Sequence, residues 1–267
     1  MIGGGVIGLS IAASCSSFGL DVLLVEREQR LAGAASGRAL GGLSPDAHPE
    51  LGPDWRAMAT HSLALHRELD AHWHYGLREL DLLVLPDLVI ERQAHCDPLR
   101  FCAALARHAG AIATSVTGER LRDVHPTHVV RATGVHDSPD ARWTKGHLVA
   151  TAPVDPVLDR MVASVVDDVA VVQLASGHII AGGTKEPGID DASVDDAVCA
   201  HVADVAGVHC GDLDVTHRWT CFRPQLADEQ PFIGRIGDEW VASGFYSTGI
   251  LMAPYVGETI AKMILEW

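Results

Sequence analysis

The stretch Gly3-Gly4-Gly5-Val6-Ile7-Gly8 opens the chain, and Glu26 follows 18 residues after Gly8. Apolar residues recur with helical spacing over residues 6–18, and residues 21–26 have the composition of a strand. A glycine turn, a helix and a strand in this order make up most of a βαβ unit. The opening therefore predicts an α/β fold with a Rossmann-like nucleotide-binding domain.

Each glycine of this fingerprint has a physical role. Gly3 permits a tight turn, Gly5 lets the backbone approach a pyrophosphate, and Gly8 lets the helix pack closely on the strand. The helix N-terminus offers N–H groups to phosphates. Glu26 can accept hydrogen bonds from ribose hydroxyls and would repel the extra phosphate of NADP. The alternative is a glycine-rich turn without a ligand.

The first strand of this unit is nearly missing. Only Met1 and Ile2 precede Gly3, whereas strands usually contain about five or six residues. The bulk of the first strand is therefore absent from the sequence, and we expect a chain start that is truncated or misassigned.

Composition limits the classes of function. The 267 residues are 48% hydrophobic and carry a formal net charge of -15, which is typical of a globular protein and unfavourable for binding nucleic acid or an anionic membrane. Six cysteines occur without a CxxC pair, so we expect no disulfide framework, no metal site and a cytoplasmic location. There is also no apolar run of the roughly 18 residues that span a bilayer.

The remainder of the chain alternates between helical and strand patterns. Helical spacing occurs at residues 55–74, 96–108 and 253–265, and strand patterns occur at residues 80–91, 128–132, 147–183 and 240–243. We expect a smaller antiparallel-sheet substrate domain inserted into the nucleotide-binding domain. The expected FAD-binding domain comprises residues 1–75, 96–140 and 225–267, and the substrate domain comprises residues 76–95 and 141–224.

Further segments match one family in order along the chain. They are Glu26-Arg27, Gly33-Ala34-Ala35-Ser36-Gly37-Arg38, Gly41-Gly42-Leu43, Ala132-Thr133-Gly134, Gly182-Gly183-Thr184, Arg223-Pro224 with Asp228, Pro231, Ile233 and Gly234, and Gly249-Ile250-Leu251-Met252-Ala253-Pro254. With the opening glycines, they resemble the FAD-dependent D-amino-acid oxidase superfamily, in its glycine oxidase and sarcosine oxidase branch. The matches span nearly the whole chain. The absence of a second GxGxxG and of a CxxC pair indicates that electrons enter directly from an organic substrate.

The resemblance implies FAD as the cofactor and a set of residues that contact it. Small residues and backbone N–H groups suit this role because they approach a flat ring closely and stabilise negative charge on it. The implied cofactor residues are Gly3, Gly5, Val6, Ile7, Gly8, Glu26, Arg27, Ala35, Ser36, Gly41, Gly42, Leu43, Val116, Thr133, Gly134, Gly249, Ile250, Leu251 and Met252.

Two residues are candidates for the substrate pocket. Arg223 matches the family position that pairs with a substrate carboxylate, and its planar fork suits that group. The alternative for Arg223 is a structural salt bridge. Tyr246 offers a hydroxyl, or else a packed aromatic ring. Its loop lacks the second arginine of the glycine oxidase branch, and residues 76–95 are shorter than the family's substrate domain.

Cys221 falls where the sarcosine oxidase branch carries the cysteine that attaches covalently to flavin. A thiolate near an electron-poor ring could form such a bond. The alternative is a small buried apolar residue, because free cysteine is most often found in that role.

The resemblance implies oxidation of the C–N bond of a small amine or amino acid of the glycine, sarcosine or D-amino-acid type. A hydride passes to flavin, the product is an imine, and oxygen as acceptor yields hydrogen peroxide. The expected partners are this small-molecule substrate and oxygen or another acceptor. The alternatives are a catalytically impaired FAD-binding remnant and a dehydrogenase with a non-oxygen acceptor.

Overall fold

The computed structural model describes residues 1–116, 124–134, 142–227 and 229–267. Its helices are α1 (Val6–Ser17), α2 (Gly52–Trp73), α3 (Pro98–His108), α4 (Asp196–Cys210), α5 (Gly249–Glu266) and the short η1 (Ala35–Arg38), η2 (Pro45–Ala47) and η3 (Pro49–Leu51). Its strands are β1 (Leu23–Val25), β2 (Gly42–Leu43), β3 (Arg78–Val84), β4 (Leu88–His95), β5 (Ala111–Ala113), β6 (Val129–Arg131), β7 (Arg142–Thr151), β8 (Met161–Ser164), β9 (Val169–Gln173), β10 (Ile179–Gly182), β11 (Glu186–Pro187), β12 (Val215–Gln225), β13 (Phe232–Ile236) and β14 (Glu239–Ser243).

A single residue ahead of the glycine turn bridges two strands. Ile2 forms parallel bridges to Val25 of β1 and to Arg131 of β6. Its N–H donates to the Val130 carbonyl at 2.8 Å, and its own carbonyl accepts from Ala132 N–H at 2.9 Å. β5 continues the row beside β1, and β14 and β13 continue it beside β6. Ile2 therefore joins the two halves of a Rossmann-like sheet.

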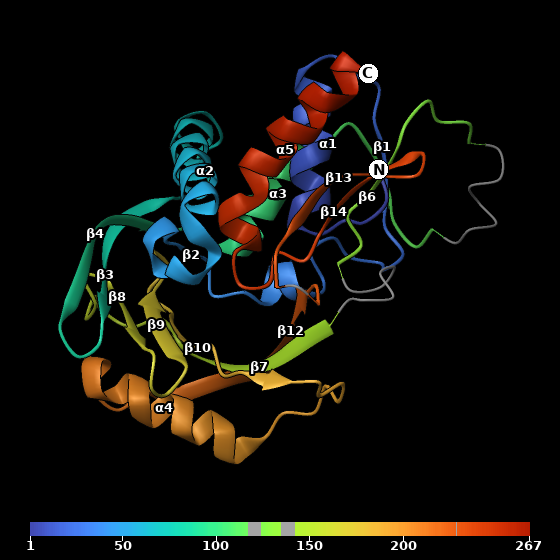
Figure 1. Ribbon diagram of the computed structural model, residues 1–267. Helices are drawn as coiled ribbons and strands as arrows, with labels where there is room; N and C mark the ends of the chain where they lie inside the picture. The colour runs from blue at the N-terminus through green and yellow to red at the C-terminus, as the bar shows by residue number, and fades with distance from the viewer. Residues whose placement is uncertain (117–123, 135–141, 228) are drawn as a thin grey trace.

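The second sheet is larger and mainly antiparallel. Its strands follow the order β12-β7-β10-β9-β8-β3-β4-β2, and β11 pairs with β7 beside β10. The pair β3–β8 is parallel. Figure 1 shows α4 covering one face of this sheet, while α1, α2, α3 and α5 lie on the other side. The predicted α/β fold with an additional antiparallel sheet is confirmed.

We propose that the chain divides into its two domains along these sheets. The predicted domain boundary at residues 140–141 lies outside the described residues. Asp228, one of the residues that resemble the family, also lies outside them.

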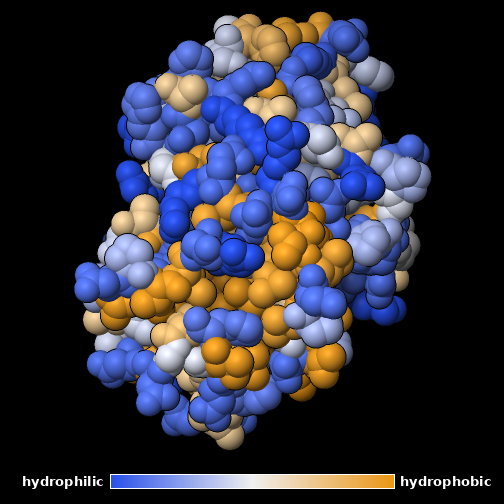
Figure 2. Space-filling view, turned by 90° about the vertical axis from the view of Figure 1, so that its left-hand side faces the viewer, coloured by the Kyte–Doolittle hydropathy of each residue, from blue (hydrophilic) through white to orange (hydrophobic). Residues whose placement is uncertain are grey.

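One edge of the molecule is notably apolar. Figure 2 views the side that carries β3 and β4 and shows hydrophobic residues gathered across the middle of that face. Leu88 at the start of β4 is 58% exposed and Val166 after β8 is 96% exposed.

No helix in the described part of the chain combines the length and apolar character needed to cross a bilayer.

Helix α5 begins at Gly249, whereas the sequence predicts a start near residue 253. The difference arises because Pro254 lies inside the helix, where proline usually marks the first turn. Proline has no N–H, so the Ile250 carbonyl four residues earlier loses its helical donor. His66 of α2 replaces that donor, since its Nε2 lies 2.9 Å from the Ile250 oxygen.

A second side chain of α2 bridges the next carbonyl and N–H pair of α5. The Ser62 hydroxyl donates to the Leu251 carbonyl at 2.6 Å and accepts from Tyr255 N–H at 3.1 Å, so it is inserted into the α5 ladder. Ser62 and His66 are both fully buried. The Tyr75 hydroxyl lies 2.9 Å from His66 Nδ1. Helix α2 therefore supplies the polar partners that allow the first turn of α5 to form despite Pro254.

Replacing His66 with leucine leaves the Ile250 carbonyl without a donor in a buried position. We expect the H66L variant to lose about 1–3 kcal/mol in free energy of unfolding, measured by urea denaturation at pH 7.5. H66Q restores an N–H donor and should lose less. The matched control is H72L, because His72 is exposed on the same helix.

The pH dependence of stability provides a second test. Burial lowers the pKa of His66 from 6.5 to about 4, so between these values the unfolded chain binds a proton that the folded protein excludes. With respect to His66, the folded protein has its full free energy of unfolding above about pH 6.5, and this free energy declines as the pH falls to 4. H66Q should lack this component of the pH dependence; an identical pH profile in wild type and H66Q would contradict the account.

Candidate active site

A cavity of about 930 Å³ lies between the two sheets. Its walls come from the opening glycine turn, η1, the segment after η1, the inner face of the larger sheet and the first turn of α5. Ligand sites typically occupy about 300–1,000 Å³, so this volume suits a large ligand.

Close backbone packing places the N-terminus of α1 at this cavity. A Cβ on Gly3 would overlap the Ala132 carbonyl, and a Cβ on Gly8 would overlap the Gly3 carbonyl oxygen. Gly3 also has φ of +108°, which a side chain would disfavour. Helix α1 then starts after Gly5 with no acidic residue in its first turn. Its N-terminus therefore presents positive potential, which favours an anionic ligand group.

Glu26 is held beside the glycine turn at the end of β1. Its Oε2 accepts from Gly4 N–H at 2.6 Å, and its Oε1 accepts from Glu28 N–H at 2.8 Å. The backbone carbonyl of Glu26 accepts from Val116 N–H at 3.0 Å, which brings Val116 to the same end of the cavity. Each carboxylate oxygen retains further acceptor capacity, so Glu26 can still bind ligand hydroxyls.

Most residues predicted to bind cofactor line this one cavity. The predicted residues in its wall are Gly3, Gly5, Val6, Ile7, Glu26, Arg27, Ala35, Ser36, Gly41, Gly42, Val116, Thr133, Gly134, Gly249, Ile250 and Leu251. Gly8, Leu43 and Met252 lie behind the wall: Gly8 packs on Gly3, while Leu43 and Met252 are fully buried in the core. The structure thus gathers segments separated by more than 200 residues.

Arginines that sequence reasoning missed also reach the cavity. Arg30, Arg38 and Arg131 join Arg27 and Arg223 in its wall, against the carboxylates of Glu26 and Glu28. Glu239 pairs with Arg131, so the other four arginines face the two glutamates and leave a smaller local positive excess in a chain with net charge -15. This excess suits a pyrophosphate and a carboxylate. Arg38 belongs to a segment that resembles the family but is not predicted to bind a ligand, and no periodicity or motif distinguishes Arg30 and Arg131 from surface arginines.

A second helix N-terminus also meets the cavity. Helix α5 has no acidic residue in its first turn, and its first residues Gly249, Ile250 and Leu251 line the space. The Thr248 side chain does not cap this end, because its hydroxyl instead donates to the Phe245 carbonyl at 2.7 Å. Negative charge that develops on a bound ring would be stabilised there.

Arg223 and Tyr246 come together in the cavity wall. The Arg223 Cζ lies 5.2 Å from the centroid of the Tyr246 ring, and the guanidinium donates to the carbonyls of Gly183 and Thr184. The Nε of Arg223 is buried without a hydrogen-bond partner among the described residues. Gly146 leaves space for the guanidinium, since a Cβ there would lie 2.8 Å from it. Each terminal nitrogen of the guanidinium carries a second N–H, so Arg223 retains donors for a carboxylate.

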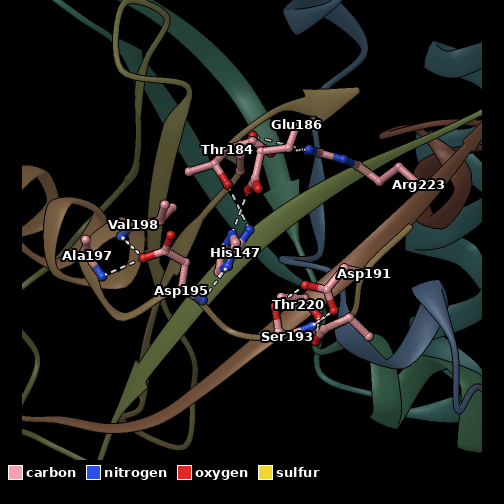
Figure 3. Close-up of polar contacts among 12 residues, drawn as sticks. His147, Thr184, Glu186, Asp191, Ser193, Asp195, Ala197, Val198, Thr220 and Arg223 are labelled. Carbon is pink, nitrogen blue, oxygen red and sulfur yellow. Dashed lines mark hydrogen bonds and ion pairs between the residues drawn. The ribbon is translucent and has the colours of Figure 1, made fainter. Parts of the chain in front are cut away.

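Thr184, whose carbonyl accepts from Arg223, is held in place by a histidine on the opposite face of the sheet (Figure 3). His147 is fully buried, and its backbone N–H donates to the Thr184 hydroxyl at 2.8 Å. His147 Nδ1 lies 2.7 Å from Glu186, and its Nε2 accepts from Asp195 N–H at 3.0 Å. This pattern places the ring proton on Nδ1. His147 thus anchors Thr184, whose carbonyl holds the Arg223 fork.

Cys221 faces the cavity between these groups. It is 5% exposed, and its Sγ lies 3.8 Å from the Ala35 carbonyl. Burial raises the pKa of the thiol, which favours the protonated form over the nucleophilic thiolate. The environment therefore favours a buried apolar role for Cys221.

The described residues fit an FAD molecule. The helix N-terminus and Glu26 suit a pyrophosphate and a ribose, the local arginines balance the phosphate charge, and the cavity volume suits a dinucleotide. Gly41, in the cavity wall, has φ of +92°, and a Cβ there would overlap the Cys96 carbonyl, so backbone packing requires glycine at this position.

Curated relatives are similar to the chain in sequence. A glycine oxidase from Bacillus licheniformis is 29% identical over 107 residues, a match that spans 37% of this chain and 28% of the relative. A putative thiamine biosynthesis oxidoreductase, ThiO, from Rhizobium etli is 26% identical, with 98% of this chain and 95% of the relative covered.

Structural and family comparisons cover the whole fold. The crystal structure of glycine oxidase from Geobacillus kaustophilus matches with a TM-score of 0.87 at 20% identity, covering 99% of this chain and 93% of the other. The DAO family model, described as FAD dependent oxidoreductase, matches residues 1–88 and 84–263. The two matched ranges meet at the turn between β3 and β4. The chain therefore belongs to the DAO family of FAD-dependent oxidoreductases.

Proposed function

We propose that the protein oxidises the C–N bond of an amino acid or small amine that is held by Arg223 against FAD. The observation that carries this proposal is the Arg223 guanidinium in the cavity wall, held in place by the carbonyls of Gly183 and Thr184. An arginine in this position supports a carboxylate-bearing substrate, because its planar donors match a carboxylate geometrically.

The surroundings of Arg223 support positioning as the protein's main contribution. Carbonyl acceptors at Gly183 and Thr184 orient the guanidinium, and the Tyr246 ring packs beside it. When bound, FAD supplies the redox chemistry by accepting a hydride from the carbon beside the amine nitrogen. A substrate whose amine arrives neutral needs no protein base, so orientation by Arg223 supplies the catalytic advantage.

Reaction products follow from this assignment. The substrate loses a hydride from carbon and a proton from nitrogen, which leaves an imine that water hydrolyses to a carbonyl compound and ammonia or an amine. Two electrons then pass to an acceptor, for which we propose oxygen, with hydrogen peroxide as its product. The apolar walls around Arg223 support the exclusion of water from the reacting atoms.

Purified protein loaded with FAD tests the proposal. Anaerobic mixing with glycine, sarcosine, proline or D-amino acids should bleach the flavin absorbance, and oxygen should restore it with uptake on an oxygen electrode. Bleaching without oxygen uptake would identify a dehydrogenase that uses another acceptor. Failure to take up FAD, or bound flavin that none of these compounds reduces, would overturn the proposal in favour of a non-catalytic remnant.

Arg223→Lys keeps the positive charge and removes the fork. We expect about a 10- to 100-fold weaker apparent affinity for amino-acid substrates, because a charge-assisted hydrogen bond contributes about 1.5–3 kcal/mol. The limiting rate of flavin reduction should change less. Stopped-flow reduction at increasing substrate concentration separates the two quantities.

The matched control for this variant is R218K, on the same strand but on the outer face of the sheet. Amines that lack a carboxylate provide a second control, because R223K should leave their affinity unchanged. Equal losses for substrates with and without a carboxylate would refute the assigned role of Arg223.

A further inference from the structure

We infer that the substrate carries an extended apolar chain, which lies in a trough on the inner face of the larger sheet and points away from Arg223. This inference rests on the proposed function, since it specifies the substrate of the same site. The apolar trough is the surface formed by Leu148, Gly182, Ala170, Ala163, Met161 and Leu82, all of which line the cavity.

The strand register places the floor of the trough in one straight row. Leu148 pairs with Gly182, Gly182 pairs with Ala170, and Ala170 pairs with Ala163. Directly opposed residues share a face of a sheet, so the side chains of Leu148, Ala170 and Ala163 and the open position at Gly182 face the cavity from four neighbouring strands. The row crosses three strand spacings, a length of about 14 Å.

Side-chain size makes this row hollow. Gly182, Ala170 and Ala163 carry a single methyl group or none, while Met161 and Leu82 pair with each other at the far end. From the other side, Leu40 and Ala47 line the cavity and pack against the cluster of Leu82 and Met161. The trough is therefore a narrow space between two apolar walls.

In the described part of the chain, the strands that form the floor of this space contribute no charged side chain to it. The described residues that β3, β7, β8, β9 and β10 contribute to the cavity wall are all glycine or apolar. Arg223 donates to the carbonyl of Gly183, the neighbour of Gly182, so the cationic group sits where the row passes through β10. A carboxylate on Arg223 leaves its attached chain facing apolar surface, which stabilises methylene groups and penalises a second charge.

Linear monocarboxylates test the trough independently of turnover. Acetate, butyrate, hexanoate and octanoate lack an amine, so they bind without oxidation, and calorimetric titration of the FAD-loaded protein gives each dissociation constant. We expect each added methylene to tighten binding about three- to fourfold until the trough is filled, because burying one methylene changes affinity by that amount. Octanedioate, which ends in a second charge, should lose this gain.

Variants locate the effect within the trough. Ala170→Leu and Ala163→Leu fill the floor and should lower the octanoate-to-acetate affinity ratio about tenfold or more, whereas A57L, on the exposed surface of α2, should not change it. Thermal unfolding checks that each variant is folded; the wild-type chain-length series tests the inference whether or not they fold.

The outcomes separate this inference from the proposed function. Dissociation constants that do not depend on chain length, or octanedioate binding as tightly as octanoate, would overturn the trough even if amino acids reduce the flavin. Chain-length dependence without reduction by any amine would support the trough and refute the proposed reaction.

Discussion

The contact between two glycines near the N-terminus determines where everything else in the site can lie. A side chain on Gly8 would overlap the Gly3 carbonyl, so only glycine allows the first turn of α1 to pack directly on the backbone of the glycine turn. Close packing at this point matters because Ile2, directly before Gly3, bridges β1 and β6 by itself. Once this contact forms, the positive end of α1, Glu26 and the residues of η1 converge on one cavity. The cofactor site is therefore a consequence of backbone packing more than of any polar side chain.

A second constraint acts at the other region of the cavity. Pro254 deprives α5 of a hydrogen bond near its N-terminus, and buried side chains of α2 satisfy the freed carbonyls. The first turn of α5 is thereby tied to α2 as well as to its own helix. Two helix N-termini, each without an acidic residue in its first turn, thus face the same space from different elements. Together with the local arginines, they give an acidic protein a cationic pocket.

Sequence reasoning succeeds where the physics is local. The glycine turn, the strand ending at Glu26 and most helices are visible because spacing and turn chemistry act over a few residues. It fails for α5, whose early start depends on His66, a residue 184 positions away from the carbonyl it satisfies. The His147 network and the arginines that join the cavity are missed for the same reason, since their roles exist only after distant strands pair. The apolar trough likewise depends on the register of four strands, which no single segment encodes.

The central claim is that the α1 N-terminus and Glu26 recognise the nucleotide half of FAD, and comparing two flavins tests it most directly. Fluorescence titration of flavin-free protein with FAD and with FMN measures the contribution of that half, because FMN lacks the adenosine portion. The account predicts that FAD binds about a hundredfold more tightly or better, and that ADP competes with FAD, since a few charge-assisted hydrogen bonds are at stake. Equal affinity for FAD and FMN, or no competition by ADP, would contradict it.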